Sequence, residues 1–268
     1  MHVVRAAVVT LGAATLLAAG GRAAVEPTVR HPYAVVVDLR GRVFVADGAA
    51  RRIVLLSPRT GRRSVHATGF DEPTGLAATR NALYVADFHA GVVRRVGADK
   101  RVKTLARLPQ VTAVAVSPSG VVYAVTMNGV LARIASSGRI TRVAVRGGLD
   151  RPHGVVFDRA GDILVAEDSR RVRRIDPATG RAKLVVDGVD TNRIAVGRDG
   201  TLFLAGGSPI GGSLRRLEPG GKPTIVFEGP HVSDVAVLRN GDLIVTAVEP
   251  GAVFRIDPRT GARKKIAG

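Results

Sequence analysis

The chain contains no cysteine and no tryptophan, and only 4% of its 268 residues are aromatic. The lack of cysteine excludes disulfide bonds, thiolate nucleophiles and cysteine-ligated metals. The scarcity of aromatic rings argues against single-stranded nucleic-acid binding, in which bases stack on aromatic side chains. Sugar recognition through flat aromatic surfaces is disfavoured for the same reason. We therefore expect no nucleic acid among the partners.

Lysine is also scarce, because arginine supplies all but six of the 40 basic residues, and the formal charge is +18. An arginine-rich surface can attract anionic polymers of the cell envelope, acidic glycans or lipid headgroups. The alternative is a cationic composition without a specialised role. The basic residues are spread over the whole chain and do not form one tract, which favours this alternative.

The first 24 residues are typical of a secretory signal peptide. Arg5 precedes an apolar run over residues 6–19, which is too short to span a bilayer comfortably. Gly21-Arg22-Ala23 is a candidate cleavage site, and an uncleaved anchor is the alternative. We expect a secreted protein of net charge +16, from +18 less Arg5 and Arg22, with no transmembrane span after cleavage.

Six copies of one short pattern fill the chain from about position 31 to its end. Each is an apolar run with a small or acidic last residue: VFVAD (43–47), LYVAD (83–87), VYAVT (122–126), ILVAE (163–167), LFLAG (202–206) and LIVTA (243–247). The last residues lie 40, 39, 41, 39 and 41 positions apart. A period near 40 built from short strands predicts a β-propeller. We expect an all-β, six-bladed propeller of four-stranded antiparallel blades, formed by residues 25–268 as a single monomeric domain.

The third β segment of the repeat carries an arginine before its last apolar residue in five of the six copies: Arg95, Arg133, Arg174, Arg216 and Arg255. Such a repeat predicts either a basic ring or a structural role. We favour the structural role, in which the stem packs between blades and the guanidinium reaches carbonyls or carboxylates. Residues 25–30 are candidates for an extra edge strand on the terminal blade.

Two sets of polar residues are expected to converge at one end of the central channel, because the first two strands of each blade are antiparallel. The first set precedes the first strands: Tyr33, Thr74, Thr112, His153, Asn192 and Ser233, with Asp234 one position on. The second set follows the second strands: Asp47, Asp87, His89, Glu167, Asp168 and Glu249.

These side chains suggest a metal site, a catalytic site and a ligand-binding site. Asn192 and Asp234 are candidate ligands for Ca²⁺ or another divalent cation, which prefers carboxylate and amide oxygens. His153 is a candidate general base, with Glu167 or Asp168 to orient it.

The remaining candidates, assigned to ligand binding together with Asp168, are Asp47, Asp87 and His89. For Asp47 and Asp87 we favour the alternative that these carboxylates bond to nearby backbone N–H groups and arginines.

The repeats resemble known propeller families. EPTGLAATRNALYVAD (72–87) and RPHGVVFDRAGDILVAED (151–168) are similar to NHL repeats, and also to the SMP-30/gluconolactonase and streptogramin-lyase propellers. The resemblance covers residues 31–268 and implies the fold, whereas these families differ in chemistry.

The resemblance to SMP-30-like lactonases implies a divalent metal held by Glu, Asn and Asp side chains. Asn192 matches the Asn position, Ser233 occupies the Asp position with Asp234 beside it, and Tyr33 replaces the Glu. The Glu-x-His pair of the streptogramin lyases has no counterpart.

We therefore predict a secreted NHL-like propeller that binds a small molecule or a protein through its channel face, without catalysis. A separate interpretation is electrostatic attachment to an anionic envelope polymer through the arginine-rich surface. The alternative is an SMP-30-like metal-dependent hydrolase, or lactonase, that uses Asn192, Asp234, Glu167 and His153.

Overall fold

The computed structural model describes residues 26–208 and 210–268, which form 24 strands. The predicted signal peptide lies outside the described residues. Within these two ranges, no helix is long and apolar enough to cross a membrane. The strands form six sheets of four, each antiparallel and, within its sheet, in chain order.

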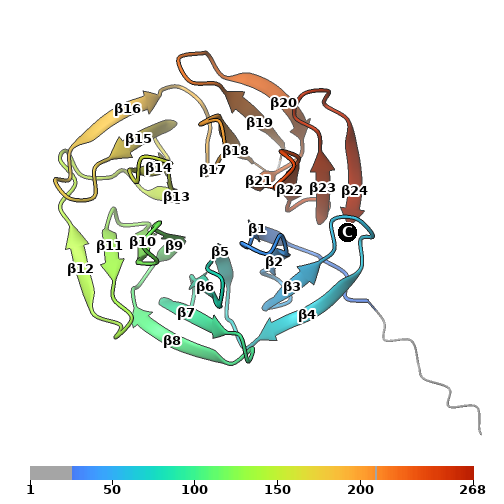
Figure 1. Ribbon diagram of the computed structural model, residues 1–268, viewed down its shortest axis with the longest axis horizontal. Helices are drawn as coiled ribbons and strands as arrows, with labels where there is room; N and C mark the ends of the chain where they lie inside the picture. Colours follow the sequence, from blue (N-terminus) through green and yellow to red (C-terminus); the bar gives the residue numbers. More distant parts are fainter. Residues whose placement is uncertain (1–25, 209) are drawn as a thin grey trace, which may run out of the picture.

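The sheets are arranged as blades around a central axis (Figure 1). Blade 1 consists of β1 (Pro32–Val37), β2 (Val43–Asp47), β3 (Arg52–Leu56) and β4 (Arg63–Thr68). Blade 2 consists of β5 (Pro73–Ala78), β6 (Ala82–Asp87), β7 (Val92–Gly97) and β8 (Val102–Arg107). Blade 3 consists of β9 (Val111–Val116), β10 (Val122–Thr126), β11 (Leu131–Ile134) and β12 (Ile140–Val143).

The other half of the ring repeats this organisation. Blade 4 consists of β13 (Pro152–Phe157), β14 (Ile163–Glu167), β15 (Arg171–Ile175) and β16 (Ala182–Val186). Blade 5 consists of β17 (Arg193–Val196), β18 (Leu202–Ser208), β19 (Gly211–Leu217) and β20 (Thr224–Gly229). Blade 6 consists of β21 (Val232–Val237), β22 (Leu243–Ala247), β23 (Ala252–Ile256) and β24 (Arg263–Ala267). The prediction of an all-β, six-bladed propeller is confirmed.

The core lies between neighbouring blades, and the second strands are its centre. All five residues of β2, β10, β14 and β22 are buried. These strands are apolar on both faces because each face packs against another blade. Phe44 of blade 1, for example, shares one cluster with Leu83 and Val85 of blade 2. Complete burial of such a side chain stabilises the fold by about 1.5–3 kcal/mol.

The ring closes without an exchange of strands, since blade 1 uses only the N-terminal repeat and blade 6 only the C-terminal one. Residues 26–30 form no strand, so within the described chain the suggested edge strand does not form. Val29 instead packs into the cluster that contains Ile266 and Ala267. Apolar contact between the two ends of the chain therefore joins blade 6 to blade 1.

The repeated arginine of the third strand has the structural role we favoured in three of its five copies. Arg174 Nε lies 2.9 Å from Asp158 Oδ2, and Arg255 Nη2 lies 2.6 Å from Asp242 Oδ2. Arg216 Nη2 lies 3.0 Å from Glu218 Oε1. The pairs of Arg174 and Arg255 hold the first turn of blades 4 and 6 against the third strand, whereas that of Arg216 lies at the end of the third strand itself.

Candidate functional site at the start face of the channel

The propeller has two distinct faces around its axis. We call the one where the inner strands β1, β5, β9, β13, β17 and β21 begin the start face, and the one with the turns that follow these strands the turn face. Pairing of Pro32 with Asp47 places the end of the second strand on the start face. Both predicted sets of polar residues consequently lie there.

At one position of the inner strands, two blades carry a charged residue where the other four carry glycine or alanine. Pairing with the second strands aligns Ala34, Gly75, Ala113, Gly154, Arg193 and Asp234. Because four blades carry only glycine or alanine here, the long side chain of Arg193 has room to extend across the axis.

Blades 5 and 2 lie on opposite sides of the ring (Figure 1). The Arg193 side chain extends from blade 5 to blade 2 across the channel. Its Nη2 donates to the carbonyls of Thr74, at 2.8 Å, and Thr112, at 3.2 Å. Its Nη1 donates to the carbonyls of His153 and Asn192. The four Nη hydrogens thus have acceptors, whereas the buried Nε has none among the described residues. Arg193 therefore obstructs the channel at the start face.

Asp234 is the acidic neighbour of this partly buried cation. Its Oδ2 accepts from Val35 N–H at 2.9 Å and its Oδ1 from Val235 N–H at 2.7 Å. Burial raises the pKa of Asp234 to about 6, although Arg193 and these two N–H groups act in the opposite direction. Burial likewise lowers the pKa of Arg193, and the charge of Asp234 raises it. The carboxyl group therefore titrates just below neutral pH.

The hydroxyl residues of the first predicted set tie neighbouring blades together. Thr74 Oγ1 donates to the Thr112 carbonyl at 3.2 Å, and Thr112 Oγ1 to the Pro152 carbonyl at 2.7 Å. Ser233 Oγ donates to the Pro32 carbonyl at 2.8 Å, across the junction of blades 6 and 1. These hydroxyls stabilise the ring.

The carboxylates of Asp47, Asp87 and Glu167 are almost fully buried and hold the connections between blades. Asp87 Oδ1 accepts from the backbone N–H groups of Asp71 and Glu72 at 2.9 and 2.8 Å, and its Oδ2 from Arg94 Nε at 3.1 Å.

The same arrangement recurs in two other blades. Asp47 accepts from His31 N–H and from Arg52. Glu167 accepts from Asp150 N–H at 2.7 Å and from Arg173 Nε at 2.7 Å. These bonds support the structural alternative for Asp47 and Asp87, and Glu167 behaves in the same way.

His153 and Asp168 form the pair that the sequence suggested. His153 Nε2 lies 3.3 Å from Asp168 Oδ1, while Asp168 also pairs with Arg151. Burial and the charge of Arg193 lower the pKa of His153, and Asp168 raises it by charge and hydrogen bonding. The net shift is downward, so the imidazole is neutral at pH 7.

A second polar pair lies between blades 1 and 2. His89 Nε2 is 3.1 Å from Glu72 Oε2, and His89 is largely exposed. Burial raises the pKa of Tyr33, and the charge of Glu72 adds to this effect. Glu249 is exposed beside blade 6 and, among the described residues, makes no ion pair.

Two further histidines were assigned no role from the sequence, yet they flank the same face. The rings of His31 and Tyr33 lie 6.3 Å apart. His231 precedes β21, and its buried Nδ1 has no hydrogen-bond partner among the described residues. The only signal in the sequence is that both histidines adjoin a proline directly before an inner strand.

The residues near the axis do not fit the divalent cation that the resemblance implies. Asn192 Nδ2 donates to the Gly207 carbonyl at 3.3 Å, and both oxygens of Asp234 accept backbone N–H groups. The guanidinium of Arg193 contacts the Asn192 carbonyl and acts on Asp234 through its charge, and this positive charge opposes a metal ion. No group of three or more His, Asp or Glu side chains in the described chain could hold one.

Beyond Arg193, the channel is a cavity of about 280 Å³. The inner strands line this cavity. The lining extends from Arg193 and Asp234 at the start face to residues such as Val37 and Val237 near the turn face. These strands present their unpaired edges to the axis, so free backbone N–H and C=O groups accompany the small apolar side chains. The cavity therefore suits water or a polar ligand.

Comparison with known proteins supports the fold. No protein-family model matches the sequence, and none of the curated protein sequences does either. Among solved structures, one of a nidogen/laminin complex matches with a TM-score of 0.74 and 12% identity, over 85% of this chain and 93% of that chain.

Two other solved structures are similar. Virginiamycin B lyase from Staphylococcus aureus matches with a TM-score of 0.65 and 16% identity, over 90% of this chain and 86% of that one. Regucalcin from Agrobacterium tumefaciens, described as a calcium-binding protein, matches with a TM-score of 0.65 and 18% identity, over 82% and 83%. At these identities the likeness shows the propeller fold, shared by binding proteins and enzymes.

Proposed function

We propose that this protein is a binding module that recognises a ligand or a protein segment at the start face and does not transform it. The obstruction of the channel by Arg193 carries this proposal, since its four Nη hydrogens are used by carbonyls. What is left for a ligand is a shallow polar rim around the obstruction. Within the described residues, no group of three or more metal-ligating side chains supplements His153 there.

The chemistry of the rim indicates which groups it recognises. When neutral His153 donates its Nε2 hydrogen to Asp168, its Nδ1 is left as a hydrogen-bond acceptor. The exposed Asp168 and Glu249 add further acceptors. The rim therefore favours a ligand rich in N–H or O–H donors, such as an extended peptide segment. We further propose an extracytoplasmic location, which rests on residues 1–24 alone.

The test is a thermal-shift screen with short peptides and polyols, followed by calorimetry on each compound that raises the melting temperature. We expect His153→Gln and Asp168→Asn to abolish the rise. Asp99→Asn removes a more exposed carboxylate in the turn between β7 and β8, far from the rim, and should leave the rise intact. A compound recovered as product would show an enzyme, and a rise that persists in both rim variants would place binding elsewhere.

A separate experiment decides the hydrolase alternative. Ca²⁺, Zn²⁺ and Mn²⁺ are each titrated at millimolar levels against thermal stability. We expect no rise in melting temperature. A rise that Asn192→Ala abolishes would instead support the SMP-30-like hydrolase and contradict the proposal.

A further inference from the structure

The turn face carries a second set of arginines, which differs from the repeated arginine of the third strand. Five of the six turns that follow the inner strands contain one: Arg40, Arg80, Arg159, Arg198 and Arg239. All five are exposed, and within the described residues none of them forms an ion pair. The turn of blade 3 instead has Pro118 and Ser119 at the corresponding positions.

Most carboxylates of these turns are already engaged. Asp38 accepts from the N–H groups of Arg40 and Arg42 and pairs with the Arg42 side chain at 2.8 Å. Asp158 and Asp242 pair with third-strand arginines, as described above. The carboxylate of Asp199 accepts a hydrogen bond from the backbone N–H of Thr201 in the same turn, and hydrogen bonds from Thr201 lower the pKa of Asp199. Positive charge therefore dominates at the tips of the turns.

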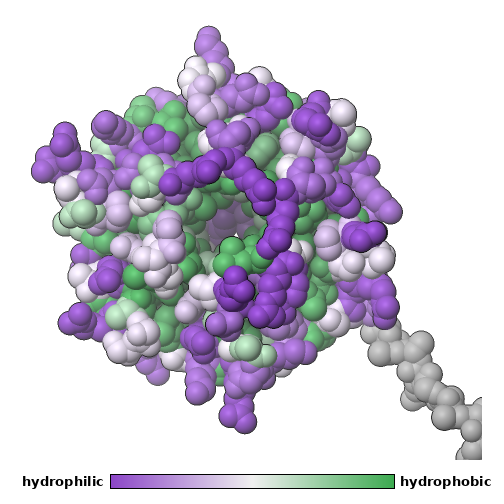
Figure 2. All heavy atoms as spheres, viewed as in Figure 1, coloured by the Kyte–Doolittle hydropathy of each residue, from purple (hydrophilic) through white to green (hydrophobic). Residues whose placement is uncertain are grey.

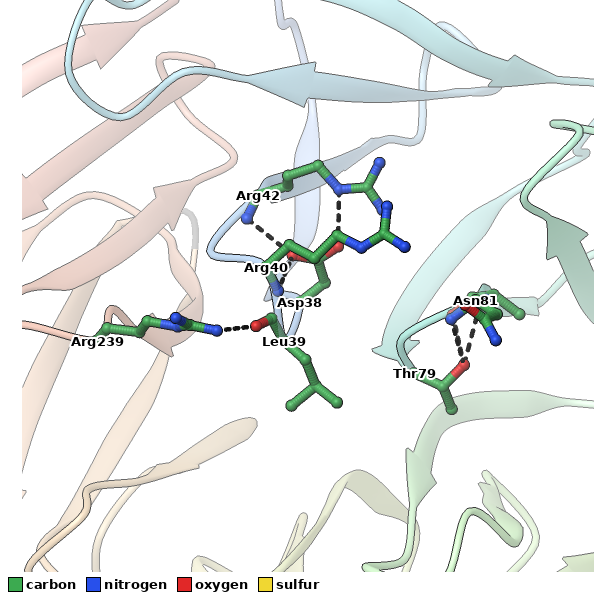
Figure 3. Close-up of polar contacts among 8 residues, drawn as sticks. Asp38, Leu39, Arg40, Arg42, Thr79, Asn81 and Arg239 are labelled. Atoms are coloured by element: carbon green, nitrogen blue, oxygen red, sulfur yellow. Dashed lines mark hydrogen bonds and ion pairs between the residues drawn. The ribbon is translucent and has the colours of Figure 1, made fainter.

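The geometry of the propeller brings these arginines around one axis. The turns directly follow Val37, Ala78, Phe157, Val196 and Val237, which line the channel cavity. Figure 3 shows Arg239 reaching the Leu39 carbonyl, while Arg40 and Arg42 point the same way over Asp38. Figure 2 shows a hollow at the axis, edged on one side by hydrophilic side chains and elsewhere by apolar ones.

We propose that the turn face binds a compact polyanion with several phosphate or sulfate groups, held on the propeller axis by these five arginines. Guanidinium groups match phosphate oxygens in bidentate geometry. A single exposed ion pair changes affinity by only about two- to fivefold, so a simple anion at one arginine binds weakly. A ligand with several charges on the axis contacts arginines from several blades at once.

Other anionic partners fit this face less well. The six turns contain no aromatic residue on which nucleobases could stack. Leu39, 60% exposed, is the one large exposed apolar residue in the turns, too little for insertion into a lipid surface. The phosphate groups could belong to a free oligophosphate or to the end of a phosphate-rich polymer.

The experiment measures binding of inorganic tripolyphosphate to the mature chain by calorimetry. We expect one site, whose affinity falls between about 50 and 200 mM salt because the contacts are exposed ion pairs. Arg80→Ala/Arg198→Ala removes charges from opposite blades and should weaken binding about four- to 25-fold. Arg107→Ala/Arg142→Ala, on exposed outer strands, is the control of equal charge and should change affinity less than twofold.

A gain of affinity provides an independent test. Ser119→Arg places an arginine at the position of Arg40 in the turn of blade 3, before Gly120, and should strengthen binding about two- to fivefold. Equal losses in the ring and control variants would mean non-specific attraction to a cationic protein and would overturn the proposal. So would an absence of binding at 50 mM salt. Long-chain polyphosphate serves as the comparison ligand. If it binds with the same affinity per chain as tripolyphosphate, the site recognises chain ends. If only tripolyphosphate binds, the ligand is a free oligophosphate.

Discussion

Arg193 and Thr74 lie on blades that face each other across the axis, and the Nη2 of Arg193 lies 2.8 Å from the Thr74 carbonyl oxygen. This contact separates the start face of the channel from the cavity behind it. The start face becomes a polar rim above an obstructed channel, and the cavity beyond opens towards the arginines of the turn face. Four tests of this arrangement concern single side chains.

Arg193→Ala should open the channel and lower the free energy of unfolding by about 1–3 kcal/mol, because carbonyls of several blades lose a charged donor. Water in the channel will hydrate some of these carbonyls, which limits the loss. Urea denaturation measures the change. Arg142→Ala on an exposed outer strand should stay within about 0.5 kcal/mol of the wild type, and equal losses in both variants would refute the role of Arg193.

Asp234 should make stability decrease as the pH rises. Its pKa is about 6 in the folded protein, above the value of 3.8 for an exposed carboxyl. The folded state therefore holds this proton more tightly, and the resulting stabilisation, complete below about pH 4, is lost as the pH passes through 6. The loss should approach about 3 kcal/mol.

Asp234→Asn is the matched variant, since its amide does not titrate. Denaturation of both proteins from pH 4 to 8 should show the wild type losing stability relative to the variant. Parallel pH profiles would show that the pKa of Asp234 is not raised in the folded protein.

Gly154→Ala should disturb the start face although the change is one methyl group. The added Cβ would lie 2.5 Å from the Asn192 carbonyl oxygen and 3.2 Å from Arg193 Cα, so the backbones of blades 4 and 5 would have to separate. We expect a loss of about 1–3 kcal/mol. Gly41→Ala serves as a comparison with open space around the added atom, although its positive φ of 78° adds local strain. Urea denaturation measures the loss, and a free energy of unfolding unchanged from the wild type would contradict this close packing.

Asp168→Asn should lower the pKa of His153 further, because Asp168 is the group that raises it. Titration of the histidine signals by NMR measures this shift. The pKa of His66, lowered by burial and by Lys100 and Arg42, should stay unchanged in the same spectra. An unchanged His153 would mean that the two side chains are not paired in solution.

The sequence determined the blade architecture because the repeated apolar strand is a local pattern. Each VFVAD-type copy is buried between neighbours, so its period specifies both the number of blades and the centre of each. The pairing of His153 with Asp168 was also predictable, since antiparallel strands bring a strand start next to a strand end.

The roles of the charged residues depended on the tertiary structure. The sequence left Asp47 and Asp87 open to ligand binding and Glu167 to orienting His153, yet each accepts hydrogen bonds from N–H groups of a connection 15 to 17 residues away. The sequence did not predict the role of Arg193, because its acceptors include the carbonyls of Thr74 and Thr112, which are 119 and 81 residues away. Closure of the ring brings these groups together, and no local pattern encodes that distance.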